Sequence, residues 1–141
     1  MNSAFVADAS VGAAWLVSTQ SNDVTDRLLD DAKTGVPFHV PCLWILEVSN
    51  TLLLLRRRGR LDEVDCKQSF LDLVGLRPHV DETNYSLVLP TISNLAEQHN
   101  LSIYDAVYLE LALRRALPLA SRDTALNKAA KRAGVRTLLA H

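Results

Sequence analysis

Short apolar runs alternate with longer amphipathic segments along this chain. In the longer segments apolar residues recur at intervals of three and four, which predicts helices, whereas the short runs are typical of buried strands. Strands that alternate with helices favour a parallel sheet, because each helix returns the chain to the edge where the next strand starts. We therefore expect an α/β fold: a short, mostly parallel sheet of about five strands with helices on both faces. The expected strands are residues 4–7, 38–40, 77–80, 117–120 and 135–138, and the expected helices are residues 11–16, 23–34, 43–58, 61–74, 83–98, 103–115 and 123–132.

The length of 141 residues fits a single domain, residues 1–141. With 48% hydrophobic and 22% charged residues, the composition is that of an ordinary globular protein and excludes extended disorder. The two cysteines, Cys42 and Cys66, form neither a disulfide framework nor a metal-binding pattern, so we expect reduced thiols. No signal peptide and no apolar stretch of about 20 residues is found, so we expect a cytoplasmic protein that does not contact membranes.

The formal net charge of −1 bears on nucleic-acid binding. A protein that holds nucleic acid through its overall charge is usually strongly basic, so any such contact here must be local or depend on bound metal ions. The main basic run fills the last turn of the helix expected over residues 43–58 and continues just beyond it. It can contact phosphates or simply supply favourable charge at a helix C-terminus. It consists of Arg56, Arg57, Arg58 and Arg60.

Two acidic residues stand where expected strands end. Asp8 follows the first strand and Asp123 follows the strand expected over residues 117–120. In open parallel sheets ligands bind outside the carboxyl ends of the strands, so both positions suit a functional site. Both also have ordinary structural explanations, because aspartate is common in turns and at helix N-caps.

Two further acids lie on expected helices. Glu47 is three residues after Trp44, beside an apolar surface on which an unpaired carboxylate is costly. Asp105 follows Ser102 at the spacing of a capping box, with aspartate in place of glutamate. The alternatives are an edge residue whose carboxylate reaches water for Glu47 and a helix-capping role for Asp105.

If the four acids lay close together, they would form a site for protons or a divalent cation. Two carboxylates about 5 Å apart repel by roughly 3 kcal/mol at an effective dielectric constant near 20. Such a cluster holds protons or a divalent cation, and oxygen ligands favour Mg²⁺ or Mn²⁺ over Zn²⁺. A centre of this kind suits phosphodiester hydrolysis, and the sequence has no G-x-S-x-G or Cys–His motif for a side-chain nucleophile.

Four blocks match a known family in its order. They are residues 6–10 with Trp15 and Leu16, residues 41–50, residues 102–109, and residues 118–123 with Leu126, Ala129 and Ala130. In these blocks the chain resembles the PIN-domain ribonucleases, specifically the VapC-type toxins of bacterial toxin–antitoxin pairs.

The resemblance implies a three-layer αβα sandwich, PIN-like, around the short sheet. It also implies a metal-dependent endoribonuclease with one or two Mg²⁺ or Mn²⁺ ions. It also implies a homodimer, cleavage of cellular RNA such as transfer or ribosomal RNA, and inhibition by a small antitoxin protein. The alternative is a catalytically silent PIN-like module that binds RNA or protein. The implied catalytic and metal-binding residues are Asp8, Glu47, Asp105 and Asp123.

Polar neighbours of these acids match supporting positions in the family. The resemblance implies that Ser10, Asn50 and Ser121 hydrogen-bond to the acids. Asn127 stands near a position where some members have another acid, which leaves the number of ions open. By contrast, the sequence around Tyr108 predicts plain core packing.

Overall fold

The computed structural model describes residues 3–139 and contains a four-stranded parallel sheet in the order β3-β2-β1-β4. The strands are β1 (Phe5–Ala7), β2 (Phe38–Pro41), β3 (His79–Asp81) and β4 (Leu119–Ala120). All three pairings are parallel. The α/β fold is therefore as predicted, with a smaller sheet than expected.

The fifth expected strand, residues 135–138, is reduced to one bridge between Leu119 and Thr137. Leu119 donates its N–H to the Arg136 carbonyl and accepts from the N–H of Leu138. The pairing cannot extend toward the start of β4, because the N–H of Leu117 is already bonded to the Ala112 carbonyl at the end of the preceding helix. The short β4 thus limits the sheet to four strands within residues 3–139.

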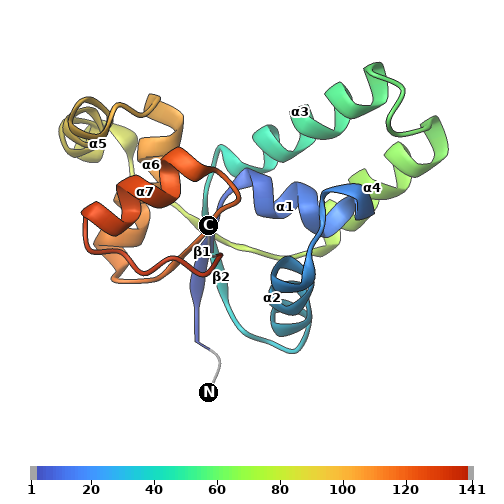
Figure 1. Ribbon diagram of the computed structural model, residues 1–141, viewed down its shortest axis with the longest axis horizontal. Coiled ribbons are helices and arrows are strands. Elements are labelled where there is room, and N and C mark those ends of the chain that lie inside the picture. Colours follow the sequence, from blue (N-terminus) through green and yellow to red (C-terminus); the bar gives the residue numbers. More distant parts are fainter. Residues whose placement is uncertain (1–2, 140–141) are drawn as a thin grey trace.

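Helices cover both faces of the sheet (Figure 1). The first face carries α1 (Ala9–Leu16), α2 (Asp23–Lys33), α3 (Trp44–Arg57) and α4 (Glu63–Gly75), with a short 3₁₀ turn (Ser18–Gln20) between α1 and α2. The second face carries α5 (Tyr85–His99), α6 (Ile103–Arg115) and α7 (Thr124–Arg132), and α6 packs directly on β1, β2 and β4. All seven predicted helices are present, which gives the three αβα layers.

Two details of the helices differ from simple expectation. The sequence predicts that Ser10 caps a helix starting at Val11, but α1 starts at Ala9 and Asp8 is its N-cap. The sequence also predicts a kink or a break in the helix at Pro90, but α5 continues through this residue as one helix. No helix within residues 3–139 combines the length and the apolar character needed to cross a bilayer.

An aromatic core holds the first helical layer against the sheet. The Trp15 and Phe38 rings meet edge to face with centroids 5.0 Å apart, and the Trp44 ring also contacts Phe38 with centroids 6.0 Å apart. The Trp44 indole N–H donates a 3.0 Å hydrogen bond to the carbonyl of Asp8. The core therefore fixes the backbone at the point where β1 ends.

Gly12 lets α1 and α3 approach closely above this core. A Cβ at this position would lie 2.7 Å from Cζ2 of Trp44 and 2.7 Å from Cγ2 of Val48, which is closer than real contacts allow. The small residue thus sets the separation of the two helices that flank Asp8.

Candidate active site

The strand order creates a switch point between β1 and β4. The chain goes from β1 to β2 and β3 on one side, and then crosses to β4 on the other side of β1. Ala7 pairs with Ala120 at the end of both strands, and the N–H of Asp8 donates a 3.0 Å hydrogen bond to the Ala120 carbonyl. In open α/β sheets, ligands usually bind at such a switch point, outside the carboxyl ends of the strands.

Asp8 lies at this switch point and is buried, with only 5% of its surface exposed. Its Oδ1 accepts hydrogen bonds from Ser10 Oγ at 2.6 Å and from the Val11 N–H at 3.1 Å, and its Oδ2 accepts a short hydrogen bond from Ser121 Oγ. Burial raises the pKa of Asp8 to about 6 although these bonds lower it, and the charge of Asp105 raises it further.

The two serines join the turns that follow β1 and β4. Ser10 Oγ accepts a 2.8 Å hydrogen bond from the Arg122 N–H, and Ser121 Oγ accepts a 2.9 Å hydrogen bond from the Asp123 N–H. Because each hydroxyl accepts from the backbone, it is oriented to donate to the Asp8 carboxylate. The Asp8 side chain is therefore held in one orientation from both turns.

Glu47 lies in the first turn of α3 and is bonded to a tyrosine. The hydroxyl of Tyr108 donates a 2.6 Å hydrogen bond to Oε1 of Glu47. Burial raises the pKa of Glu47, the Tyr108 bond lowers it, and the charge of Asp105 raises it. The prediction that Tyr108 is plain core is therefore incomplete: its ring is buried, but its hydroxyl reaches the site.

Asp105 and Asp123 both lie at helix starts. The N–H of Asp105 bonds to Ser102 Oγ at 3.1 Å, and Oδ1 of Asp123 accepts from the Leu126 N–H at 2.7 Å. Burial raises the pKa of the half-buried Asp105, the charge of Asp123 raises it too, and hydrogen bonding with Ser102 lowers it. The N-cap explanation therefore holds for Asp123. For Asp105 the contacts among residues 3–139 show Ser102 as the N-cap, without the reciprocal bond from the Ser102 N–H to the Asp105 carboxylate. Both carboxylates also lie close enough to other acids to interact with them.

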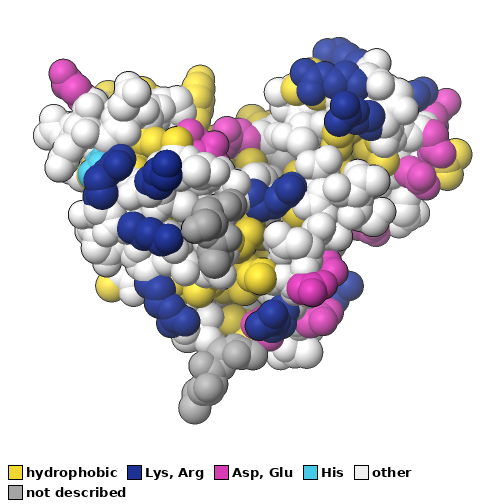
Figure 2. Space-filling model, viewed as in Figure 1, with side chains coloured by type: hydrophobic (Ala, Val, Ile, Leu, Met, Phe, Trp, Pro, Cys, Tyr) yellow, Lys and Arg dark blue, Asp and Glu magenta, His cyan; other side chains and the backbone are white. Residues whose placement is uncertain are grey.

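The four acids form one electrostatic group, with Asp105 as its common member. Asp105 repels Asp8, Glu47 and Asp123. In Figure 2 acidic side chains gather in the notch between α3 on one side and α6 and α7 on the other. Across residues 3–139 no lysine, arginine or histidine forms an ion pair with any of the four.

This surplus of carboxylate oxygen suits a hard divalent cation, which would offset the repulsion. As the side chains stand, however, no three acidic, histidine or cysteine groups among residues 3–139 are placed to hold one ion. The carboxylates are thus close enough to interact and have not converged on a common point. Metal ligation by the four acids remains a prediction.

Two amides complete the picture. Asn50 is exposed on α3, and its side chain makes no hydrogen bond to the acids within the described residues. Asn127 is buried and donates from Nδ2 to the Ser121 carbonyl at 2.9 Å, whereas its Oδ1 has no partner within residues 3–139. Asn127 therefore supports the β4 turn and leaves one oxygen available.

The arginine run lies away from the acids. Arg57 is ten residues after Glu47 on the same helix, which corresponds to about 15 Å along the axis. The four arginines are exposed at the end of α3 and in the turn before α4, where Asp62 and Glu63 follow them. The structure therefore does not bring Arg56, Arg57, Arg58 and Arg60 to the acidic group.

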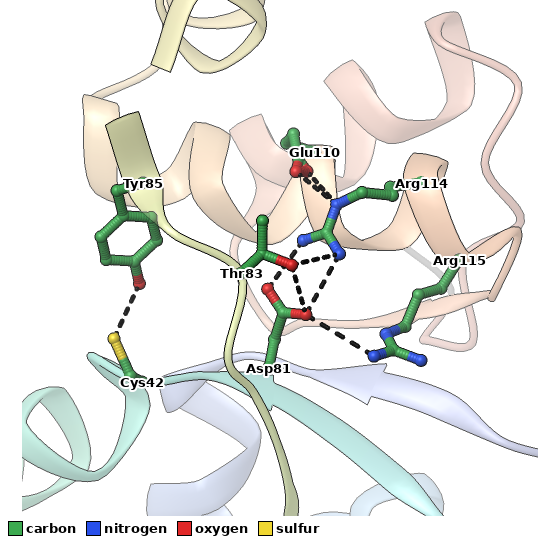
Figure 3. Close-up of polar contacts among 7 residues, drawn as sticks. All are labelled: Cys42, Asp81, Thr83, Tyr85, Glu110, Arg114 and Arg115. Atoms are coloured by element: carbon green, nitrogen blue, oxygen red, sulfur yellow. Dashed lines mark hydrogen bonds and ion pairs between the residues drawn. The ribbon is translucent and has the colours of Figure 1, made fainter. Parts of the chain in front are cut away.

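An ion-pair network beyond the site was not predicted from the sequence (Figure 3). Arg114 on α6 contacts Asp81 at the end of β3 at 2.7 Å and Glu110 at 2.8 Å, and both carboxylates are almost fully buried. Arg115 adds a longer contact of 3.6 Å to Asp81. This network ties the edge strand to α6, the helix that carries Asp105 and Tyr108.

Comparison with known proteins places the fold and the family. The PIN domain family matches residues 5–132. The chain is 31% identical to Ribonuclease VapC3 of Pyrobaculum aerophilum over 107 residues, which are 76% of this chain and 79% of that protein.

Two crystal structures share the fold. PAE2754 from Pyrobaculum aerophilum aligns with a TM-score of 0.71 at 22% identity, over 98% of this chain and 92% of that one. FitAcB from Neisseria gonorrhoeae aligns with a TM-score of 0.61 at 20% identity, over 94% and 95%. These matches and the order of strands and acids agree, and the chain belongs to the PIN-domain family, among its VapC-type members.

Proposed function

We propose that this protein is an endoribonuclease that hydrolyses RNA phosphodiester bonds with Mg²⁺ or Mn²⁺ and acts as the toxin of a toxin–antitoxin pair. The observation that carries the proposal is the buried Asp8 carboxylate, which Ser10 and Ser121 fix beside further acids. No basic side chain within residues 3–139 forms an ion pair with these acids. The name of the relative Ribonuclease VapC3 supports the same activity.

The residues that would hold the cation are Asp8 and Asp105, with Glu47 and Asp123. A divalent cation supplies Lewis-acid activation of water and offsets the negative charge on the phosphate. Carboxylate oxygens favour Mg²⁺ or Mn²⁺ for this purpose. No side-chain nucleophile is then required.

The protein's own contribution is to orient its carboxylates in advance. Ser10 and Ser121 bond to different oxygens of Asp8, and Tyr108 bonds to one oxygen of Glu47. Partners that orient ligating groups typically change metal affinity or activity by about 10- to 100-fold when they are removed. The Asp8 and Glu47 carboxylates are therefore already oriented by the protein before substrate binds.

The test is cleavage of RNA by the wild type and by Asp105→Asn, with Mg²⁺ or Mn²⁺ and with chelator. We expect the variant and the chelated wild type to lose cleavage, because both lack a complete acidic site. Asp26→Asn is the matched control, since Asp26 is an exposed acid on α2 and should leave cleavage unchanged. Equal cleavage by Asp105→Asn and wild type would reject the proposal.

Thermal unfolding gives a second measurement on the same variants. A cation that binds only the folded state stabilises it by roughly 3 kcal/mol at about 100 times its Kd. Mn²⁺ should therefore raise the melting temperature of the wild type and of Asp26→Asn more than that of Asp105→Asn. A protein that binds RNA but cleaves none with either metal would instead be a silent PIN-like module.

The proposal includes protein partners in the cytoplasm. The resemblance to VapC-type toxins implies a homodimer and a small antitoxin, and exposed apolar residues support a protein interface. Leu46, Val64, Leu71 and Val74 on α3 and α4 are all strongly exposed. Light scattering at two concentrations tests the dimer, and coexpression with the product of the adjacent gene tests inhibition of RNA cleavage.

A further inference from the structure

The region after Asp123 differs in charge from the rest of the chain. Residues 124–139 contain four basic residues and no acidic one, whereas the whole chain has 15 basic and 16 acidic residues. All four are exposed, and none forms an ion pair within residues 3–139. The four are Lys128, Lys131, Arg132 and Arg136, which we call the α7 basic face.

The geometry of α7 gathers this charge on one side of the helix. Residues 128, 131 and 132 are three and four positions apart, so they share one face. The opposite face is formed by Leu126, Ala129 and Ala130, which are buried. In Figure 2 Lys and Arg side chains gather over α7.

The α7 basic face leads directly away from the acidic group. Asp123 is the N-cap of α7, and Lys128 and Arg132 follow it by about 7 Å and about 13 Å along the helix axis. The longer distance corresponds to about four stacked nucleotides at 3.4 Å each. A strand whose phosphate lies at the acids can therefore continue along the helix.

Helix capping explains only part of the pattern. Lys131 and Arg132 lie in the last turn, where positive charge is favourable in any helix. Lys128 precedes that turn and Arg136 lies beyond the helix end, so neither is explained by the helix dipole. The acids attract phosphate only through a bound cation, so basic side chains nearby are needed to hold the rest of the RNA backbone.

We propose that the phosphate backbone of the RNA substrate binds along the α7 basic face, and that the arginine run at the end of α3 is not the main RNA contact. This inference rests on the proposed function and adds the surface that positions the substrate. The arginine run is farther from the acids and is followed by acidic residues, whereas the α7 basic face starts beside Asp123 and has no acid of its own.

The test compares two matched triple variants in the Asp105→Asn background, which suppresses cleavage. One carries Lys128→Gln, Lys131→Gln and Arg132→Gln, and the control carries Arg56→Gln, Arg57→Gln and Arg58→Gln. Binding of a single-stranded RNA oligonucleotide is measured by fluorescence anisotropy from about 50 to about 300 mM KCl, a range over which phosphate contacts weaken measurably.

We expect the α7 triple variant to bind roughly tenfold or more weakly, and its slope of log affinity against log salt to fall by about 2, since each lost phosphate contact contributes about 0.7. The control should keep the wild-type slope. Replacing Lys128 and Lys131 by arginine should retain binding, because the charge is kept. Unchanged binding by the α7 triple variant, or a larger loss in the control, would overturn the inference.

Cleavage by the same triple variants in the otherwise wild-type chain separates this inference from the proposed function. If the α7 basic face only positions RNA, KM rises while kcat stays close to the wild-type value. If the wild type cleaves RNA and the α7 triple variant cleaves it equally well, the inference is rejected and the proposed function stands. If the wild type cleaves no RNA but the α7 triple variant still loses RNA binding, the proposed nuclease activity is rejected. RNA binding along the α7 basic face is then supported. The inference would also be overturned if the α7 triple variant lost binding to an acidic protein partner while it still bound RNA.

Discussion

The Tyr108 hydroxyl bonds to Oε1 of Glu47 at 2.6 Å and thereby connects the middle of α6 to the first turn of α3. The two helices lie on opposite faces of the sheet. This hydrogen bond therefore passes over the carboxyl ends of the strands, where the acids gather. Desolvation and the neighbouring carboxylate raise the pKa of Tyr108, so the hydroxyl stays protonated and remains a donor. Glu47 is therefore oriented by a neutral donor that adds no positive charge to the site.

Tyr108→Phe should reduce RNA cleavage by about 10- to 100-fold, because Glu47 loses the group that orients it. The loss of this hydrogen bond should cost about 1 kcal/mol of folding stability. The measurement is the cleavage rate together with urea unfolding. Tyr85→Phe is the control, since the Tyr85 hydroxyl accepts a hydrogen bond from Cys42 outside the acidic group and its loss should leave cleavage unchanged. Equal rates for the two variants would show that the Glu47 contact is only structural.

Asp8→Asn should change how stability depends on pH. Burial raises the pKa of Asp8 from 3.8 to about 6, so between these values the folded protein keeps a proton that the unfolded chain has lost. The contribution of Asp8 to stability therefore falls by about 3 kcal/mol as pH rises through this range, and stays low above it.

Asparagine has no such titration, so the variant should gain stability relative to the wild type between pH 4 and pH 7, while losing cleavage. Urea unfolding of both proteins at several pH values checks this prediction. A stability difference that stays constant across the range would show that Asp8 does not titrate as its burial implies.

Gly12→Ala should destabilise the fold by about 1–3 kcal/mol, because its Cβ would overlap with Trp44 and Val48 in a packed interior. Gly75→Ala is the matched control at the end of α4, where a Cβ meets nothing within 4 Å and the helix favours alanine. Thermal unfolding should place the two variants on opposite sides of the wild type. The same direction of change in both would refute the close approach of α1 and α3.

Arg114→Met should cost about 3–5 kcal/mol, since it leaves the buried carboxylates of Asp81 and Glu110 without their partner. Lys67→Met removes an exposed i,i+4 pair with Glu63 and should change stability by less than about 1 kcal/mol. Chemical unfolding distinguishes the two cases. If the variants were equally stable, the network in Figure 3 would contribute no more than a surface pair.

The fold and the positions of the acids followed from local signals. Short apolar runs marked the strands, and the three-to-four spacing of apolar residues marked all seven helices. Asp8 and Asp123 could be assigned to one sheet edge because parallel strands end on the same side. The prediction of a fifth strand at residues 135–138 was wrong. The local sequence pattern does not reveal that the Leu117 N–H is already bonded to the preceding helix.

Contacts between distant segments were the part that local patterns could not supply. Tyr108 stands in an apolar helix, and its partner is 61 positions away, so its hydroxyl contact depends on how α3 and α6 are placed. Asp81, Glu110 and Arg114 have the composition of a solvated surface, and only their burial identifies them as a network. The arginine run was conspicuous in the sequence, yet the length of α3 carries it away from the acids.

The bond between Ser121 and Asp8 spans 113 positions, and it has a consequence for biosynthesis. A ribosome completes β1 early and β4 late, so a growing polypeptide contains Asp8 long before Ser121 or the Ala120 carbonyl exists to receive it. A translation product that stops after α6 would hold three of the four acids, yet it would lack the turn that orients the first. Such a fragment would not cleave RNA, and assembly of the four acids would be among the final steps of folding.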